Sequence, residues 1–111
     1  MNDSMFGLFK DKLADTENDR LADEIKNGAF LVDVRTPQEF SDGSVKNAVN
    51  IPLNELETSL HNFKGKGAIV VFCQSGNRSG SAKRILEKHG FQQVFNGGGW
   101  RSLNKLVNSI K

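Results

Sequence analysis

Cysteine and histidine are scarce in this chain of 111 residues. Cys73 is the only cysteine, so no disulfide can form within the chain and the fold must depend on packing. The two histidines, His61 and His89, share no metal-ligand spacing with each other or with Cys73. We therefore expect no metal site, and the lone cysteine needs another explanation.

Long apolar runs are also missing. No segment approaches the ~20 apolar residues that a membrane-spanning helix needs. The apolar run at residues 5–9 is too short for the core of a signal peptide, and acidic Asp3 precedes it. We therefore expect a cytoplasmic protein that does not enter a membrane. The 15 basic and 13 acidic residues are interspersed, so no nucleic acid partner is expected.

Apolar runs and helical patterns alternate along the rest of the chain. Continuous apolar runs at residues 29–34 and 68–72 are typical of buried parallel strands. Shorter extended pieces are expected within residues 45–51 and at residues 94–95. Helical patterns begin near residues 16–19, 37, 55, 82 and 101. This alternation predicts an α/β domain with a mainly parallel sheet over residues 17–111, after a lead-in over residues 1–16.

Cys73 ends the second apolar run and opens the stretch CQSGNRSGS, residues 73–81. Because a helical pattern follows, the thiol is expected in a turn between a buried strand and a helix N-terminus. Backbone N–H groups in such a turn, together with the helix dipole, stabilise a thiolate and lower the pKa of a cysteine. Ligands of open parallel sheets also bind beyond the carboxyl ends of the strands. The position therefore suits a nucleophile.

The alternative is that Cys73 is a small buried hydrophobe, the commoner role of a free cysteine. Three neighbours favour the nucleophile. Gly76 permits a backbone conformation that other residues resist, Arg78 brings a permanent cation, and Ser79 can cap the following helix. The expected binding loop comprises Gln74, Ser75, Gly76, Asn77, Arg78 and Ser79.

The charged residues around this loop leave alternatives open. Arg78 either pairs with a carboxylate of the protein or faces a substrate anion. Asp33 and Arg35 end the parallel strand at residues 29–34, so their side chains can reach the same edge of the sheet. For Arg35 we favour an ion pair with Glu39. Asp33 is expected to hold the loop or the following turn through backbone N–H groups, so both residues support the site from outside it.

Two further side chains, His89 and Trp100, are candidates for the site. His89 lies ten residues after Ser79 on the same predicted helix. At ~1.5 Å per residue this is ~15 Å along the axis, too far for a base acting on Cys73. Trp100 follows the glycines at residues 97–99 and is either a core residue or one wall of the mouth of the site.

The spacing of Cys73 and Arg78 resembles the active-site loop of the rhodanese superfamily. Cysteine-dependent phosphatases place five residues between the two, whereas four separate them here, and the shorter loop suits a sulfur atom better than a phosphate. Three other segments resemble rhodanese motifs in the same order: LVDVRTPQEF at 31–40, GSVKNAVNIP at 43–52 and VFNGGGW at 94–100. The matches span about residues 20 to 103.

The resemblance has three departures. Gln74 stands where many active members of the family carry arginine, Ser44 replaces a histidine, and Asn47 replaces a glycine. Glutamine still donates hydrogen bonds to an anion, but without the cation a weaker attraction for a dianion such as thiosulfate is expected.

The resemblance implies an α/β fold with a central, mainly parallel five-stranded sheet flanked by helices on both faces. It also implies a sulfurtransferase in which Cys73 takes the outer sulfur of thiosulfate, or a similar anion, as a persulfide. The acceptor would be cyanide in an assay and a thiol protein such as thioredoxin in the cell, and no cofactor is implied. The alternative is a persulfide carrier or a non-catalytic interaction module with little thiosulfate turnover, which the Gln74 departure favours.

Overall fold

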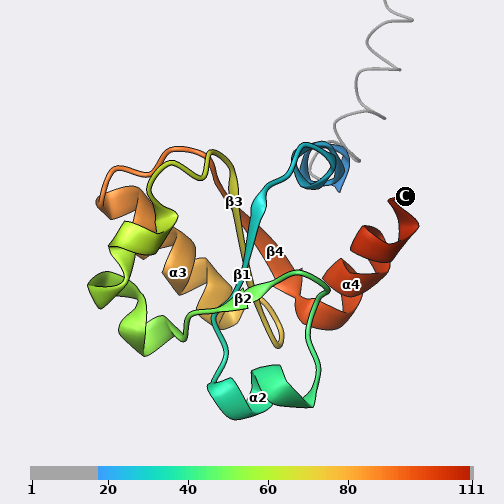
Figure 1. Ribbon diagram of the computed structural model, residues 1–111, viewed down its shortest axis with the longest axis horizontal. Coiled ribbons are helices and arrows are strands. Elements are labelled where there is room, and N and C mark those ends of the chain that lie inside the picture. Colours follow the sequence, from blue (N-terminus) through green and yellow to red (C-terminus); the bar gives the residue numbers. More distant parts are fainter. Residues whose placement is uncertain (1–17, 111) are drawn as a thin grey trace, which may run out of the picture.

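Four parallel strands form the sheet of this protein, for which a computed structural model describes residues 18–110 (Figure 1). The two long apolar runs become β1 (Phe30–Asp33) and β3 (Ile69–Cys73), which pair at the centre. β2 (Val49–Asn50) pairs with β1 on one edge, and β4 (Val94–Gly99) pairs with β3 on the other. The order across the sheet is therefore β2-β1-β3-β4.

Helices connect the strands. The first helical residues described are 18–26, so the predicted lead-in over residues 1–16 lies outside the described residues. The later helices are α2 (Pro37–Asp42), the 3-10 helices η1 (Leu53–Thr58) and η2 (Leu60–Phe63), α3 (Asn77–Lys88) and α4 (Trp100–Ser109). Within residues 18–110, no helix combines the length and apolarity needed to cross a membrane.

Each face of the sheet has its own hydrophobic layer, because successive strand side chains point to opposite faces. One layer joins β3 residues such as Val71 to Leu86 of α3 and to the 3-10 helices. The other joins β3 residues such as Val70 to Leu103 of α4 and to Leu21 of the helix over residues 18–26. Figure 1 shows α3 on one side of the sheet, with α4 and the first helix on the other. The expectation of helices on both faces is confirmed.

The expected count of five strands is wrong for the described part of the chain. Two extended pieces were expected within residues 45–51, but only Val49–Asn50 pairs with β1. The preceding residues form a turn, in which the N–H of Ala48 donates to the carbonyl of Val45 at 3.1 Å. Asn47 has a positive φ of 70°, a conformation that asparagine tolerates and extended strands exclude.

Close packing of β4 against its neighbours depends on Gly97. A Cβ atom at this position would lie 2.9 Å from Cγ1 of Val70 and 3.0 Å from Cδ2 of Leu103. Both atoms belong to buried side chains of the layer between the sheet and α4. The absence of a side chain therefore lets β4, β3 and α4 approach one another.

We predict opposite effects of alanine at two glycines. Gly97→Ala should lower the free energy of unfolding by about 1–3 kcal/mol, because the added methyl group overpacks a filled layer. Gly80 lies within α3, and a Cβ there would make only ordinary contacts, the nearest at 3.6 Å. Gly80→Ala should therefore raise the free energy of unfolding by about 0.5–1 kcal/mol through helix propensity. Urea denaturation of both variants measures this, and equal stability of the two would contradict the packing described.

Candidate active site

Cys73 is the last residue of β3 and is almost completely buried, with 1% of its surface exposed. Its register partner on β4 is Gly99, where a Cβ atom would lie 2.8 Å from the carbonyl oxygen of Gln74. β4 therefore lies directly against the start of the loop. The chain then turns through Gly76, which has a φ of 102°, into α3. This left-handed conformation is readily adopted only by glycine.

The loop brings hydrogen-bond donors to the sulfur of Cys73. The N–H of Gly76 donates to Sγ at 3.0 Å, and the N–H of Ser79 donates at 3.4 Å. The Ser79 hydroxyl oxygen also lies 3.4 Å from Sγ. Ser79 does not cap the helix as predicted, because α3 already begins at Asn77 with Gly76 as its N-cap. Ser79 instead lies in the first turn, fully buried, with its hydroxyl against the sulfur.

These contacts determine the acidity of the thiol. Burial is the strongest influence and raises the pKa of Cys73. The hydrogen bonds oppose it: the Ser79 side chain, the Ser79 N–H and the N–H groups of Ser75 and Gly76 all lower the pKa. Their sum outweighs burial, so the pKa of Cys73 lies below its ordinary value. This direction agrees with the expectation from the sequence.

Arg78 pairs with a carboxylate of the protein, which was one of its two predicted alternatives. Its guanidinium donates to both oxygens of Glu39 on α2, at 2.8 and 3.0 Å. The hydrogen bond from Arg78 is the main reason that the pKa of Glu39 falls to about 2. About a third of each side chain is exposed, so the pair ties the loop to α2 while its edge faces solvent. The other loop side chains, Gln74, Ser75 and Asn77, are exposed.

The predicted pair of Arg35 with Glu39 is wrong. Arg35 is buried and donates through Nη2 to Oδ2 of Asp33 at 2.7 Å and through Nε to both Asp33 oxygens. Asp33 also accepts the Arg35 backbone N–H at 2.9 Å and the Ser44 hydroxyl at 2.7 Å. Glu39 lies on α2, whose first turn faces Arg78 instead. Asp33 thus holds the turn after β1 through a backbone N–H group, as expected.

Trp100 forms a wall beside the loop. Two guanidinium groups lie over its ring, with Cζ of Arg35 5.1 Å and Cζ of Arg101 4.9 Å from the ring centroid. The side chain also packs on the core layer next to α4, so both predicted roles apply. With Gln74 and other residues it lines a cavity of about 190 Å³. The Gln74 side-chain oxygen lies 3.4 Å from Nη1 of Arg35, at the same cavity.

Asn96 on β4 is a site residue that the sequence analysis missed. Its Oδ1 accepts the Ser79 hydroxyl at 2.6 Å and the Gly98 N–H at 2.9 Å. Its Nδ2 donates to the carbonyl of Gly76 at 3.2 Å. The sequence offered one signal, since Asn96 directly precedes the glycine run at residues 97–99, but nothing in the local pattern connects it with Ser79.

The histidines lie elsewhere. His89 follows α3 at its C-terminal end, and its Nε2 lies 3.3 Å from a carboxylate oxygen of Glu57. Within residues 18–110, no group of three or more His, Cys, Asp or Glu side chains is arranged to hold a metal ion. The groups found around the sulfur of Cys73 are instead hydrogen-bond donors, the N–H groups of Gly76 and Ser79 and the Ser79 hydroxyl.

We predict that alkylation of Cys73 by iodoacetamide rises with pH about a midpoint below the ~8.5 of a free cysteine. The reason is that the loop donors stabilise the thiolate more than burial destabilises it. Because Cys73 is the only cysteine, the whole signal reports this site. A midpoint at or above that of a free cysteine would mean that the N–H groups of Gly76 and Ser79 do not act on the sulfur.

Comparison with known proteins gives a consistent result. A family model described as the rhodanese-like domain matches residues 17–105. The thiosulfate sulfurtransferase PspE of Escherichia coli is 34% identical over 74 residues, which cover 65% of this chain and 71% of PspE. A putative sulfur carrier protein of Bacillus subtilis, YrkF, is 35% identical over 66 residues, which cover 60% of this chain but only 36% of YrkF.

A solved structure agrees with the sequence matches. A rhodanese with anions from Escherichia coli has a TM-score of 0.61 and 33% identity, over 66% of this chain and 88% of that chain. Family model, relatives and fold therefore agree, and the family match covers nearly all of the described residues. The chain belongs to the rhodanese-like family.

Proposed function

We propose that this protein is a sulfurtransferase that carries a sulfane sulfur on Cys73. The observation that supports it most directly is the convergence of the Gly76 and Ser79 N–H groups on Sγ, which favours the thiolate. The relatives named thiosulfate sulfurtransferase and sulfur carrier support the same chemistry. The loop with four residues between Cys73 and Arg78 suits a sulfur atom on the cysteine.

The proposed reaction has two displacement steps. The Cys73 thiolate attacks the outer sulfur of a donor such as thiosulfate. The sulfur–sulfur bond of the donor breaks, its electron pair leaves with sulfite, and Cys73 becomes a persulfide. A thiolate or cyanide then attacks the outer sulfur, the bond to Sγ breaks, and the Cys73 thiolate is regenerated. Two successive exchanges on one nucleophile predict ping-pong kinetics.

The loop N–H groups act on Sγ in two ways. They keep Cys73 ionised for attack on the donor, and in the second step they stabilise the negative charge that develops on Sγ as the persulfide bond breaks. Fixed backbone N–H groups stabilise such charge without reorganising, the principle of an oxyanion hole applied to sulfur. The ion pair of Arg78 with Glu39 holds the loop in place. The hydrogen bond with Glu39 is the main reason that the pKa of Arg78 is raised, and the charge of Cys73 adds a smaller effect.

The alternative is a persulfide carrier or interaction module with little turnover on thiosulfate. Gln74 is the observation that favours it, because this exposed position at the mouth carries no cation and its side-chain oxygen already contacts Arg35. In either case we propose a thiol protein such as thioredoxin as the cellular acceptor, and a cytoplasmic location.

The test is Cys73→Ser, assayed for thiocyanate formation from thiosulfate and cyanide. Serine is close in size but a poor nucleophile toward sulfur, so we predict loss of activity with an unchanged circular dichroism spectrum. Asn62→Ala, an exposed substitution in η2, is the control and should keep full activity. More than a trace of activity in Cys73→Ser would overturn the mechanism.

A parallel assay separates the two candidates. The wild-type protein is given a persulfide donor and a dithiol acceptor, and sulfide release is measured. Release without thiocyanate formation from thiosulfate would identify a carrier. Failure of both assays, with Cys73 reduced, would rule out sulfur transfer by this site under the conditions used.

A further inference from the structure

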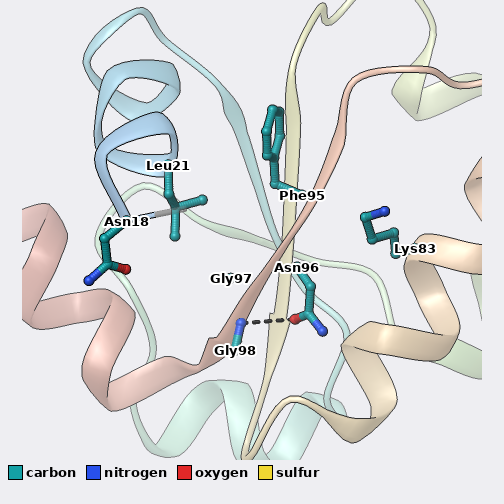
Figure 2. Close-up of a pocket in the computed structure, with 7 residues that line it drawn as sticks. All are labelled: Asn18, Leu21, Lys83, Phe95, Asn96, Gly97 and Gly98. Carbon is teal, nitrogen blue, oxygen red and sulfur yellow. Dashed lines mark hydrogen bonds between the residues drawn. The ribbon is translucent and has the colours of Figure 1, made fainter. Parts of the chain in front are cut away.

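The orientation of the Asn96 side chain is fixed by backbone partners on both sides. Oδ1 accepts the N–H of Gly98, which can only donate, and Nδ2 donates to the carbonyl of Gly76, which can only accept. Figure 2 shows the hydrogen bond between Asn96 and Gly98. Asn96 also lines a cavity of about 220 Å³ between β4, α3 and the first helix. The oxygen of the amide, not its nitrogen, therefore faces Ser79.

This orientation decides where the Ser79 hydroxyl proton lies. Oδ1 of Asn96 has no hydrogen to donate, so Ser79 must be the donor in their bond of 2.6 Å. The hydroxyl has one proton and has no solvent-exposed surface, and its other partner is Sγ of Cys73 at 3.4 Å. While the hydroxyl proton points to Oδ1 of Asn96, the Ser79 oxygen can only accept a hydrogen bond from Sγ. This arrangement favours the protonated thiol of Cys73.

We propose that Asn96 is a positioning residue for Cys73, accepting the Ser79 hydroxyl proton while the sulfur is a thiol and releasing it to the sulfur when the thiolate forms. The thiol proton leaves to water, and the Ser79 O–H rotates from Oδ1 to Sγ. Oδ1 keeps the Gly98 N–H, so the rotation does not leave this acceptor without a partner. The inference rests on the nucleophilic role of Cys73 proposed above.

The consequence is a competition for one proton. In the wild-type protein, thiolate formation requires the bond between Ser79 and Asn96 to break. Without an acceptor at position 96, the hydroxyl has only the sulfur to bind, and the thiolate is favoured further. Asn96 thus keeps Cys73 less acidic than the loop alone would make it. A less acidic thiol gives a more nucleophilic thiolate once it ionises, because nucleophilicity falls with pKa.

The charged groups around the site do not interfere with this comparison. Arg78 on α3 is paired with Glu39 of α2, and Asp33 of β1 is paired with Arg35. β4 contributes no charged side chain over Val94–Gly99. Arg101 of α4 lies on the Trp100 ring. Lys83 of α3 lines the same cavity as Asn96 and is paired with Glu87 at 2.7 Å. None of these charged groups forms a hydrogen bond with Asn96, so a neutral substitution at position 96 leaves their pairings in place.

The experiment is a double-mutant cycle of Asn96→Leu and Ser79→Ala. Leucine is similar in size to asparagine but accepts no hydrogen bond, and its bulk limits entry of a replacing water. The thiolate fraction of Cys73 is followed by ultraviolet absorbance against pH, and the iodoacetamide rate is measured in parallel. Ser81→Ala and Asn62→Ala are the matched controls, because Ser81 accepts a hydrogen bond from Arg84, Asn62 is exposed, and neither side chain is hydrogen-bonded to Cys73 or Ser79.

Asn96→Leu should shift the titration midpoint downward and raise the thiolate fraction below the midpoint about fivefold, the factor that corresponds to one net hydrogen bond. Its alkylation rate at high pH should fall, because the thiolate is less basic. Ser79→Ala should shift the midpoint upward. In the Ser79→Ala background, Asn96→Leu should have no further effect.

Two results would overturn the proposal. One is an unchanged or raised midpoint in Asn96→Leu. The other is the same downward shift with and without Ser79, since Asn96 would then act through the Gly76 carbonyl and not through the hydroxyl. The readout is the ionisation of Cys73 and not sulfur transfer, so failure of this proposal and failure of the proposed function are distinguishable.

A measurement without substitution at position 96 covers the case in which Asn96→Leu does not fold. In the wild-type protein, the side-chain amide resonances of Asn96 should titrate with the same midpoint as Cys73, because Oδ1 loses the hydroxyl. In Ser79→Ala this titration should be reduced to the small effect of the nearby charge. Equal titrations in the two proteins would contradict the proposal.

Discussion

The site depends on one constraint: a buried sulfur must be matched by donors that a short loop brings to it. Burial alone disfavours a thiolate, and the Cys73 side chain is almost completely buried. The loop compensates because the left-handed Gly76 directs its own N–H to the sulfur and starts α3 early enough to place Ser79 beside it. Several other features of the site hold this loop in position.

The holding contacts come from three different elements. α2 binds Arg78 through Glu39, whose place is fixed by its capping box with Thr36. β4 approaches through Gly99 and binds the loop through Asn96. The end of β1 and the turn after it contribute the buried pair of Asp33 and Arg35, and Arg35 reaches the Gln74 side chain. The pairing with Asp33 avoids leaving the buried charge of Arg35 unpaired, which would be costly.

The sequence was sufficient for the features that local patterns determine. The apolar runs of β1 and β3, the proline-initiated α2 and the turn after Cys73 all follow from residue type and spacing. The partners of Arg35 were not predictable in this way. Glu39 lies four residues after Arg35, but it pairs with Arg78, which approaches α2 from a distant part of the chain. The turn at Asn47 reduced the strand count because asparagine can adopt a positive φ that periodicity does not reveal. Asn96 was missed for a different reason, because its partners Ser79 and Gly76 lie about 20 residues away in the chain.

The central claim is that Cys73 carries sulfur covalently, and intact-mass spectrometry tests it most directly. The reduced protein is incubated with thiosulfate or with a persulfide donor, desalted, and analysed before and after treatment with cyanide. The account predicts an added mass of one sulfur atom, located on the peptide that contains Cys73 and removed by cyanide. An absence of the adduct with both donors, while Cys73 remains free to react with iodoacetamide, would contradict it.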